Sequence, residues 1–126
     1  MSAAVLIDTH ILIWLRTLSK PLLEKESSAI DNAHTRYISP VSFWEIALLI
    51  GVGKLGNDPR FFEVPSGFDL LLIQPKHCQM ILQLPMFHRD PYDRMLMSQA
   101  RADALVLVSR DGAMQQYGAA GLVQLA

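Results

Sequence analysis

The chain contains a single cysteine, Cys78, among its 126 residues. A lone cysteine excludes an intrachain disulfide, and no group of cysteines and histidines has the spacing of a zinc site. Nothing in the sequence therefore indicates an oxidising compartment, and we expect a cytoplasmic protein.

Long apolar runs and a basic leader are also missing. The first residues carry no basic group, and Asp8 and His10 interrupt the apolar stretch that follows, which argues against a signal peptide. No other run approaches the roughly 20 residues of a membrane-spanning helix. We therefore expect no association with a membrane.

Neither sign of charge is in excess. Eleven basic and twelve acidic residues give a formal net charge of −1. RNA binding would therefore depend on a local group of basic residues. No repeat, low-complexity tract or linker divides the sequence, and a hydrophobic content of 51% is enough for one core. We expect a single domain over residues 1–126.

Short apolar runs and stretches of helical spacing alternate along the chain. The runs predict five strands, at residues 5–7, 37–39, 72–74, 105–108 and 122–125. The spacing and the capping residues predict helices at residues 11–18, 21–33, 42–50, 68–71, 76–83, 90–100 and 111–117. This order predicts a three-layer α/β/α fold with a central parallel sheet, in which functional groups lie beyond the carboxyl ends of the strands.

Four acidic residues are expected at that edge of the sheet. Asp8 directly follows the first strand, and Asp111 follows the strand that ends at Val108. Glu45 and Asp93 lie one turn into neighbouring helices, from which both can point to the same edge. Carboxylates brought together repel one another unless a divalent cation neutralises them, and oxygen ligands suit Mg²⁺ or Mn²⁺ better than zinc. The pattern predicts metal-assisted phosphoryl transfer.

Each acid also has a purely structural interpretation. Asp8 and Asp90 are typical N-cap residues, and Ser42 with Glu45 fits the S-x-x-E capping box. Asp111, which precedes a glycine, is typical of a turn or a helix cap. Capping explains each acid separately, but it does not require four of them at one edge.

The neighbouring histidines and arginines have ordinary interpretations as well. His10 and His88 are more typical of hydrogen-bonded polar or surface groups than of metal ligands, because neither has a partner imidazole at ligand spacing. Arg89, Arg94 and Arg110 flank the acids, where they would be solvated or, beside a metal, would bind phosphate.

Three aromatic residues, Trp14, Phe43 and Trp44, lie in helical apolar patterns. Such positions are more typical of a core or an interface than of base stacking. We expect all three to pack against other apolar groups.

As a whole, the sequence resembles the VapC-like PIN domains. The resemblance rests on five blocks in the family's order: LIDTHILIW (residues 6–14), SPVSFWEIA (39–47), GKL (53–55), HRDPYDRML with the following QA (88–100) and LVSRD (107–111). The fourth block is the most diagnostic. The resemblance extends from residue 6 to about residue 117.

This resemblance implies a five-stranded parallel sheet and an endoribonuclease that depends on Mg²⁺ or Mn²⁺. In that activity, metal-activated water hydrolyses RNA phosphodiester bonds and leaves 5′-phosphate and 3′-hydroxyl ends. The protein would be the dimeric toxin of a toxin–antitoxin pair, inhibited by a cognate antitoxin.

The family's site residues carry over to this chain position by position. The catalytic and metal-binding acids would be Asp8, Glu45, Asp93 and Asp111, and the supporting residues Thr9, Asp90 and Ser109. RNA or phosphate contacts would come from Lys54, Arg89, Arg94 and Arg110. One departure is that relatives often carry a lysine shortly after the W-E-I-A block, where this chain has three apolar residues. The expected basic lining is therefore thinner.

Two other functions compete with the nuclease. A phospho-accepting receiver domain also has an acid after its first strand, but it carries a late lysine, and no lysine follows Lys76 here. A catalytically inactive PIN fold would act as a binding module. Within the enzyme class, a DNA or flap nuclease would use the same carboxylates, and the choice of RNA rests on the resemblance.

Overall fold

The computed structural model describes residues 3–126, and Met1 and Ser2, the start of the segment weighed as a signal peptide, lie outside the described residues. Its centre is a five-stranded parallel sheet in the order β3-β2-β1-β4-β5. The strands are Ala4–Ile7 (β1), Thr35–Ile38 (β2), Asp69–Leu70 (β3), Val106–Val108 (β4) and Gln124–Leu125 (β5). The α/β fold with a central parallel sheet is confirmed.

In the described part of the chain, six α-helices surround this sheet: Thr9–Thr17 (α1), Glu24–Asp31 (α2), Pro40–Gly51 (α3), Pro75–Ile81 (α4), Pro91–Ala102 (α5) and Gln115–Ala119 (α6). Two short 3₁₀ helices are Pro59–Phe62 (η1) and Gly112–Met114 (η2). Among residues 3–126, no helix is long and apolar enough to cross a membrane.

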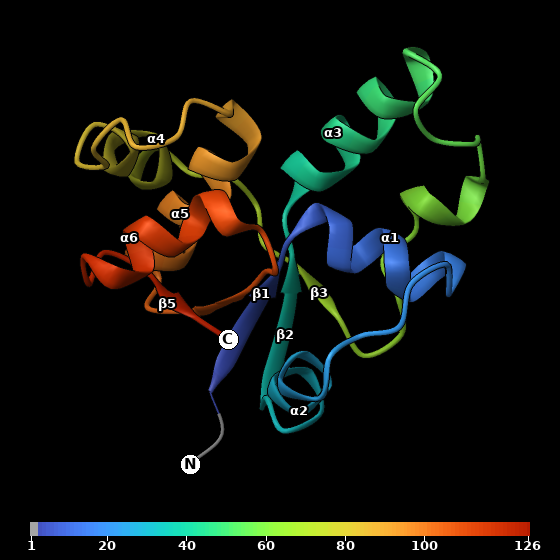
Figure 1. Cartoon of the computed structure of the whole chain (residues 1–126), viewed down its shortest axis with the longest axis horizontal. Coiled ribbons are helices and arrows are strands. Elements are labelled where there is room, and N and C mark those ends of the chain that lie inside the picture. The colour runs from blue at the N-terminus through green and yellow to red at the C-terminus, as the bar shows by residue number, and fades with distance from the viewer. Residues whose placement is uncertain (1–2) are drawn as a thin grey trace.

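The helices form two layers, one on each side of the sheet (Figure 1). Side chains of the central strand β1 alternate between the layers. Val5 and Ile7 pack with buried residues of α1, α2 and α3, whereas Leu6 packs with buried residues of α5 and α6. Each fully buried aliphatic side chain stabilises the fold by about 1.5–3 kcal/mol. The two clusters hold β1 rigidly at the centre, so the residue that follows it is fixed as well.

The third strand differs from the sequence prediction. A short helix at residues 68–71 and a strand at 72–74 were expected, but the strand is β3 at Asp69–Leu70, and both predictions are wrong. β3 is an edge strand whose residues are exposed, so no apolar run marks it. Its position is set by parallel pairing with Tyr37 and Ile38 of β2, a contact between segments far apart in the sequence.

Helix α3 begins earlier than the predicted residue 42. Its first residue is Pro40, and the Ser39 side chain caps it by accepting a hydrogen bond from a backbone N–H at 3.2 Å. The capping box of Ser42 and Glu45 is therefore absent, because Glu45 lies in the second turn. The Ser42 hydroxyl instead accepts a hydrogen bond from Thr9 at 3.0 Å. Glu45 is thus left without a capping role.

Candidate metal centre

The first two acids meet because β1 and β4 are neighbouring parallel strands. Ile7 pairs with Val108, which places Asp8 and Ser109 side by side at the carboxyl edge of the sheet. The Ser109 hydroxyl donates a hydrogen bond to Asp8 Oδ2 and accepts one from the Asp111 backbone N–H at 3.1 Å. Ser109 therefore links the strand-end acid Asp8 to Asp111.

Both of these acids also cap helices, as their structural interpretation predicts. Asp8 Oδ1 accepts a hydrogen bond from the Ile11 backbone N–H, and Asp111 Oδ1 accepts one from the Ala113 N–H, each at 2.9 Å. A carboxylate has about four lone-pair positions, so capping leaves acceptor capacity on each group. Capping and metal binding are compatible at both positions.

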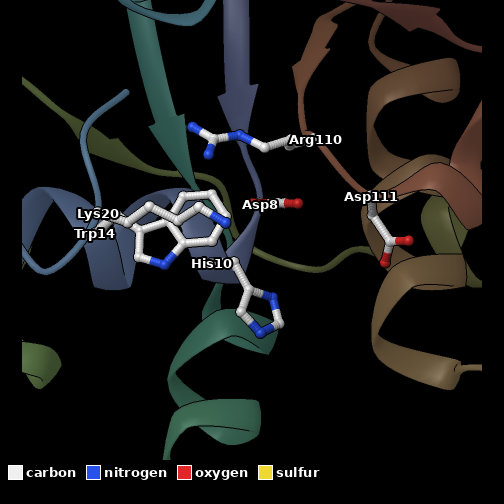
Figure 2. Close-up of a pocket in the computed structure, with 6 residues that line it drawn as sticks. All are labelled: Asp8, His10, Trp14, Lys20, Arg110 and Asp111. Carbon is white, nitrogen blue, oxygen red and sulfur yellow. The ribbon is translucent and has the colours of Figure 1, made fainter. Parts of the chain in front are cut away.

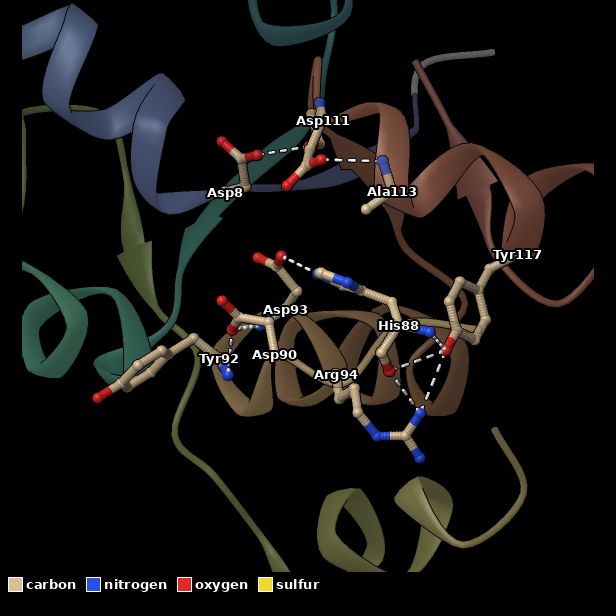
Figure 3. A network of polar contacts seen from close by, with 10 residues as sticks. Asp8, His88, Asp90, Tyr92, Asp93, Arg94, Asp111, Ala113 and Tyr117 are labelled. Atoms are coloured by element: carbon tan, nitrogen blue, oxygen red, sulfur yellow. Dashed lines mark hydrogen bonds and ion pairs between the residues drawn. The ribbon is translucent and has the colours of Figure 1, made fainter. Parts of the chain in front are cut away.

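Helix α5 brings two further acids to the same place. Asp90 is its N-cap and accepts hydrogen bonds from the Tyr92 and Asp93 backbone N–H groups at 2.8 and 3.1 Å. Asp93 Oδ2 lies 2.7 Å from His88 Nε2. Ligand atoms of His88, Asp90 and Asp93 all lie within 4.8 Å of one another. Figure 3 shows the carboxyl groups of α5 facing those of the strand-end acids.

Glu45 enters from α3 as a buried side chain that is only 8% exposed. Its Oε1 atom is buried, and no hydrogen-bond partner exists for it within residues 3–126. A buried polar atom without a partner costs about 1–3 kcal/mol. A cation at this position would supply the missing partner.

Burial changes the acidity of three of these carboxyl groups. Burial raises the pKa of Asp8 above its usual value, although the Ser109 hydrogen bond opposes the change. Burial likewise raises the pKa of Glu45 and brings that of Asp93 to about 7, where the His88 hydrogen bond acts in the opposite direction. Each group is therefore harder to ionise than a solvated carboxyl group.

Repulsion between the carboxylates adds to the effect of burial. Asp111 raises the pKa of Asp8, and Asp90, Asp111 and Glu45 raise that of Asp93. The structure thus brings within electrostatic reach of one another all four acids that the sequence predicted, together with Asp90. A divalent cation removes both the burial cost and the repulsion, and the mainly oxygen donor set suits Mg²⁺ or Mn²⁺. The residues present fit such a cation.

A buried network fixes the segment that carries His88. The Arg94 guanidinium donates to the Tyr117 hydroxyl and to the backbone carbonyls of residues 81, 84, 85 and 88. The Tyr117 hydroxyl accepts from the His88 backbone N–H at 3.0 Å and donates to Pro85 (Figure 3). Arg94, predicted as a phosphate contact, is instead buried here, and its donors face carbonyl oxygens and the Tyr117 hydroxyl.

His88 was not predicted to be a site residue, but in the structure its side chain contacts Asp93. The only local signal was its position five residues before Asp93 in the H-R-D-P-Y-D block. A loop that turns back onto α5 creates the contact, and residue spacing does not specify such a loop.

The three other predicted phosphate ligands lie in different surroundings. Arg110 forms an ion pair with the fully buried Glu26 and lines a pocket beside Asp8 and Asp111 (Figure 2). Arg89 is exposed in the segment before α5. Lys54 follows the far end of α3 and is not brought to the acids.

The fold is similar to those of several solved structures. Three of them are VapBC2 from Rickettsia felis bound to a promoter DNA fragment (TM-score 0.70, 15% identity, covering 98% of this chain and 97% of the other), a toxin–antitoxin complex from Klebsiella pneumoniae (0.62, 20%, 94% and 94%) and FitAcB from Neisseria gonorrhoeae (0.63, 18%, 96% and 95%). At these identities the likeness concerns the fold alone.

Sequence comparison identifies a protein family for this chain. No curated protein matches the chain. The family model described as PIN domain matches residues 5–120, which is nearly the whole chain, and the protein therefore belongs to the PIN domain family.

Proposed function

We propose that this protein is a VapC-type toxin that cleaves RNA with the help of a divalent metal ion. PIN domains are typically nucleases that use divalent metal ions. The observation that carries the proposal is that four acids from different elements lie within electrostatic reach at one edge of the sheet: Asp8, Glu45, Asp93 and Asp111. One oxygen of the buried Glu45 has no hydrogen-bond partner within residues 3–126, and the ligand atoms of Asp93 lie close to those of Asp90 and His88.

These four acids would hold the cation, with Asp90 beside Asp93. A bound Mg²⁺ or Mn²⁺ supplies water activation and neutralises charge on the scissile phosphate. The chain's own groups set the geometry: Ser109 links Asp8 to Asp111, Thr9 ties the start of α1 to α3, and His88 holds Asp93. Hydrolysis would leave a 5′-phosphate and a 3′-hydroxyl.

The electrostatics make substrate binding depend on the metal. Without a cation, the carboxylates repel a phosphate at the scissile position. Once they are neutralised, the basic residues of the adjoining pocket and the exposed Arg89, next to Asp90 in the sequence, are available to the phosphates of the RNA. The proposed activity therefore requires the metal for binding at the scissile position as well as for the chemistry.

A protein antitoxin and a homodimer are part of the same proposal. The solved structures with this fold include one named as a toxin–antitoxin complex. In this chain Trp44 and Leu48 of α3 and Val52, which caps the end of that helix, are exposed at four-residue spacing, so they form one apolar face. An apolar face of this kind is typical of a surface that a protein partner covers.

The proposal is tested with purified protein and total cellular RNA. Wild type, Asp93→Asn and Asp31→Asn are incubated with Mg²⁺, Mn²⁺ or EDTA, and new RNA ends are mapped. Asp31 is an exposed acid at the end of α2, next to the amino end of β2, and serves as the matched control.

Discrete cuts with 5′-phosphate ends are expected only with metal, in wild type and Asp31→Asn but not in Asp93→Asn. Equal inactivity of all three proteins with either metal, after any copurifying antitoxin is removed, would overturn the nuclease in favour of a catalytically inactive binding module. The receiver-domain alternative has no support, since the chain belongs to the PIN domain family.

A further inference from the structure

A pocket of about 290 Å³ adjoins the metal centre on its α1 side. Figure 2 shows its lining: Asp8, His10, Trp14, Lys20, Arg110 and Asp111. Asp111 stands opposite Trp14 and Lys20, with Asp8 between them. Asp8 and Asp111 belong to both the pocket and the metal centre. An RNA strand with one phosphodiester at these acids would therefore have the neighbouring nucleotide at this pocket.

The wall opposite Asp111 carries two cations above one indole ring. The Arg110 guanidinium carbon lies 4.4 Å and the Lys20 ammonium nitrogen 5.1 Å from the centroid of Trp14. The charge of Arg110 is shared with Glu26, to which it is hydrogen-bonded. Lys20 has no carboxylate partner in the described part of the chain. Of the two cations that line the pocket, Lys20 is therefore the one free to bind a phosphate.

The pocket also contains fixed planar groups. Trp14 is half-buried and packs against the core cluster of α1, so its ring is held in place while it lines the pocket. The His10 ring lies 6.0 Å from it, centroid to centroid, and Glu26 fixes the plane of the Arg110 guanidinium. Unpaired RNA bases stack on aromatic rings and on guanidinium planes. The core position expected for Trp14 and a contact with a base are thus compatible.

From these features we propose that the pocket binds the nucleotide of single-stranded RNA that adjoins the scissile phosphodiester. Lys20 binds a backbone phosphate, and the base lies against Trp14, His10 and the Arg110 guanidinium. The volume is at the small end of the roughly 300–1,000 Å³ found for ligand pockets, a size that suits one nucleotide. This assignment rests on the proposed function, since it presumes RNA at the metal centre.

The phosphate contact is tested by the salt dependence of RNA binding. Binding of a short fluorescein-labelled single-stranded RNA is followed by fluorescence anisotropy in EDTA, over a series of salt concentrations, for wild type, Lys20→Gln and Lys25→Gln. Lys25 is an exposed lysine on α2 that lies near Ala3 and Val5, toward the opposite end of β1. It therefore provides the same charge change away from the pocket.

Each phosphate contact to a single strand adds about 0.7 to the slope of log K against log salt concentration. Lys20→Gln is expected to lower the slope by about that amount, whereas Lys25→Gln keeps the wild-type slope. Equal slopes for the two lysine variants would overturn the assignment.

The contact with the base is tested by tryptophan fluorescence. The chain has two tryptophans, so Trp44→Phe leaves Trp14 as the one tryptophan whose emission is followed. Stacking predicts a change in Trp14 emission as RNA binds. In the double variant that also carries Lys20→Gln, the midpoint of this change should move to a higher RNA concentration. Trp14 emission that stays constant at saturating RNA would contradict the proposal.

Cleavage in Mg²⁺, measured on the same lysine variants, separates the two ideas. If wild type cleaves RNA but Lys20→Gln and Lys25→Gln bind RNA equally well, the proposed nuclease function stands and the proposed nucleotide site is rejected. If the protein binds RNA through Lys20 but never cleaves it, the nucleotide site stands and the nuclease function is rejected. Absence of RNA binding at low salt in EDTA, together with absence of cleavage in Mg²⁺, overturns both.

Discussion

Replacing Asp93 by asparagine is expected to stabilise the metal-free protein at alkaline pH while removing its activity. Burial raises the pKa of this carboxyl group from 3.8 to about 7. Between these values the unfolded chain loses the proton while the folded protein keeps it, so stability falls as the pH rises. Above about pH 7 the folded protein bears the whole cost of ionising Asp93. Asparagine keeps the shape and has no charge to bury.

The magnitude follows from the two pKa values. At about 1.4 kcal/mol for each pKa unit, the difference between 3.8 and about 7 sets an upper bound of about 4 kcal/mol above pH 7, and solvent screening of the partly exposed side chain lowers it. The gain from Asp93→Asn is expected to grow by about 1–3 kcal/mol between about pH 5 and about pH 8. Asp93→Asn also removes a negative charge from the first turn of α5, where such a charge is favourable to the helix dipole. This loss reduces the gain in stability by about 0.3–1 kcal/mol.

The assay is urea-induced unfolding in EDTA at both pH values, for wild type, Asp93→Asn and the exposed control Asp31→Asn. The control should follow wild type at each pH. Addition of Mg²⁺ should stabilise wild type, by about 2.7 kcal/mol at a concentration 100-fold above its dissociation constant, and stabilise Asp93→Asn much less. An Asp93→Asn protein destabilised equally at both pH values would refute the reasoning.

Further predictions concern the residues that support the site. Tyr117→Phe removes the hydroxyl that joins His88, Pro85 and Arg94, and it should lower the free energy of unfolding by about 1–3 kcal/mol in urea denaturation; an unchanged value would contradict the role of the network. The hydrogen bond from Arg110 lowers the pKa of Glu26, so the stability contributed by this pair is present above about pH 4.5 and lost as the pH falls through the lowered pKa. The free energy of unfolding of Glu26→Gln should lack this dependence on acid pH. If the free energies of wild type and Glu26→Gln changed in parallel with pH, the prediction would be wrong. Ser109→Ala removes the hydroxyl between the strand-end acids and should weaken Mn²⁺ binding roughly 10- to 100-fold in calorimetry; wild-type affinity would exclude an orienting role.

The acids at the strand ends were predictable because their placement is local. Asp8 and Asp111 each follow an apolar strand within a few residues, and neighbouring parallel strands end at one edge. Glu45 and Asp93 needed only the helical spacing that follows or precedes such a strand. The fold followed from the same alternation of strands and helices.

Residues whose surroundings depend on loops were not predictable in the same way. Arg94 and Arg110 both lie next to an acid in the sequence, yet one is buried among carbonyls and the other lines the pocket. The difference arises from how residues 81–88 turn back onto α5, which also places His88 against Asp93. Strand β3 was misplaced for a related reason, since only its distant partner β2 defines it.

The central claim, that these acids form a metal centre, is tested most directly by Mn²⁺ binding to metal-free protein in isothermal titration calorimetry. Wild type and Asp31→Asn are expected to bind Mn²⁺ with the same affinity, whereas Asp93→Asn loses at least about tenfold. Equal affinity in all three proteins, or no binding by wild type, would contradict the account.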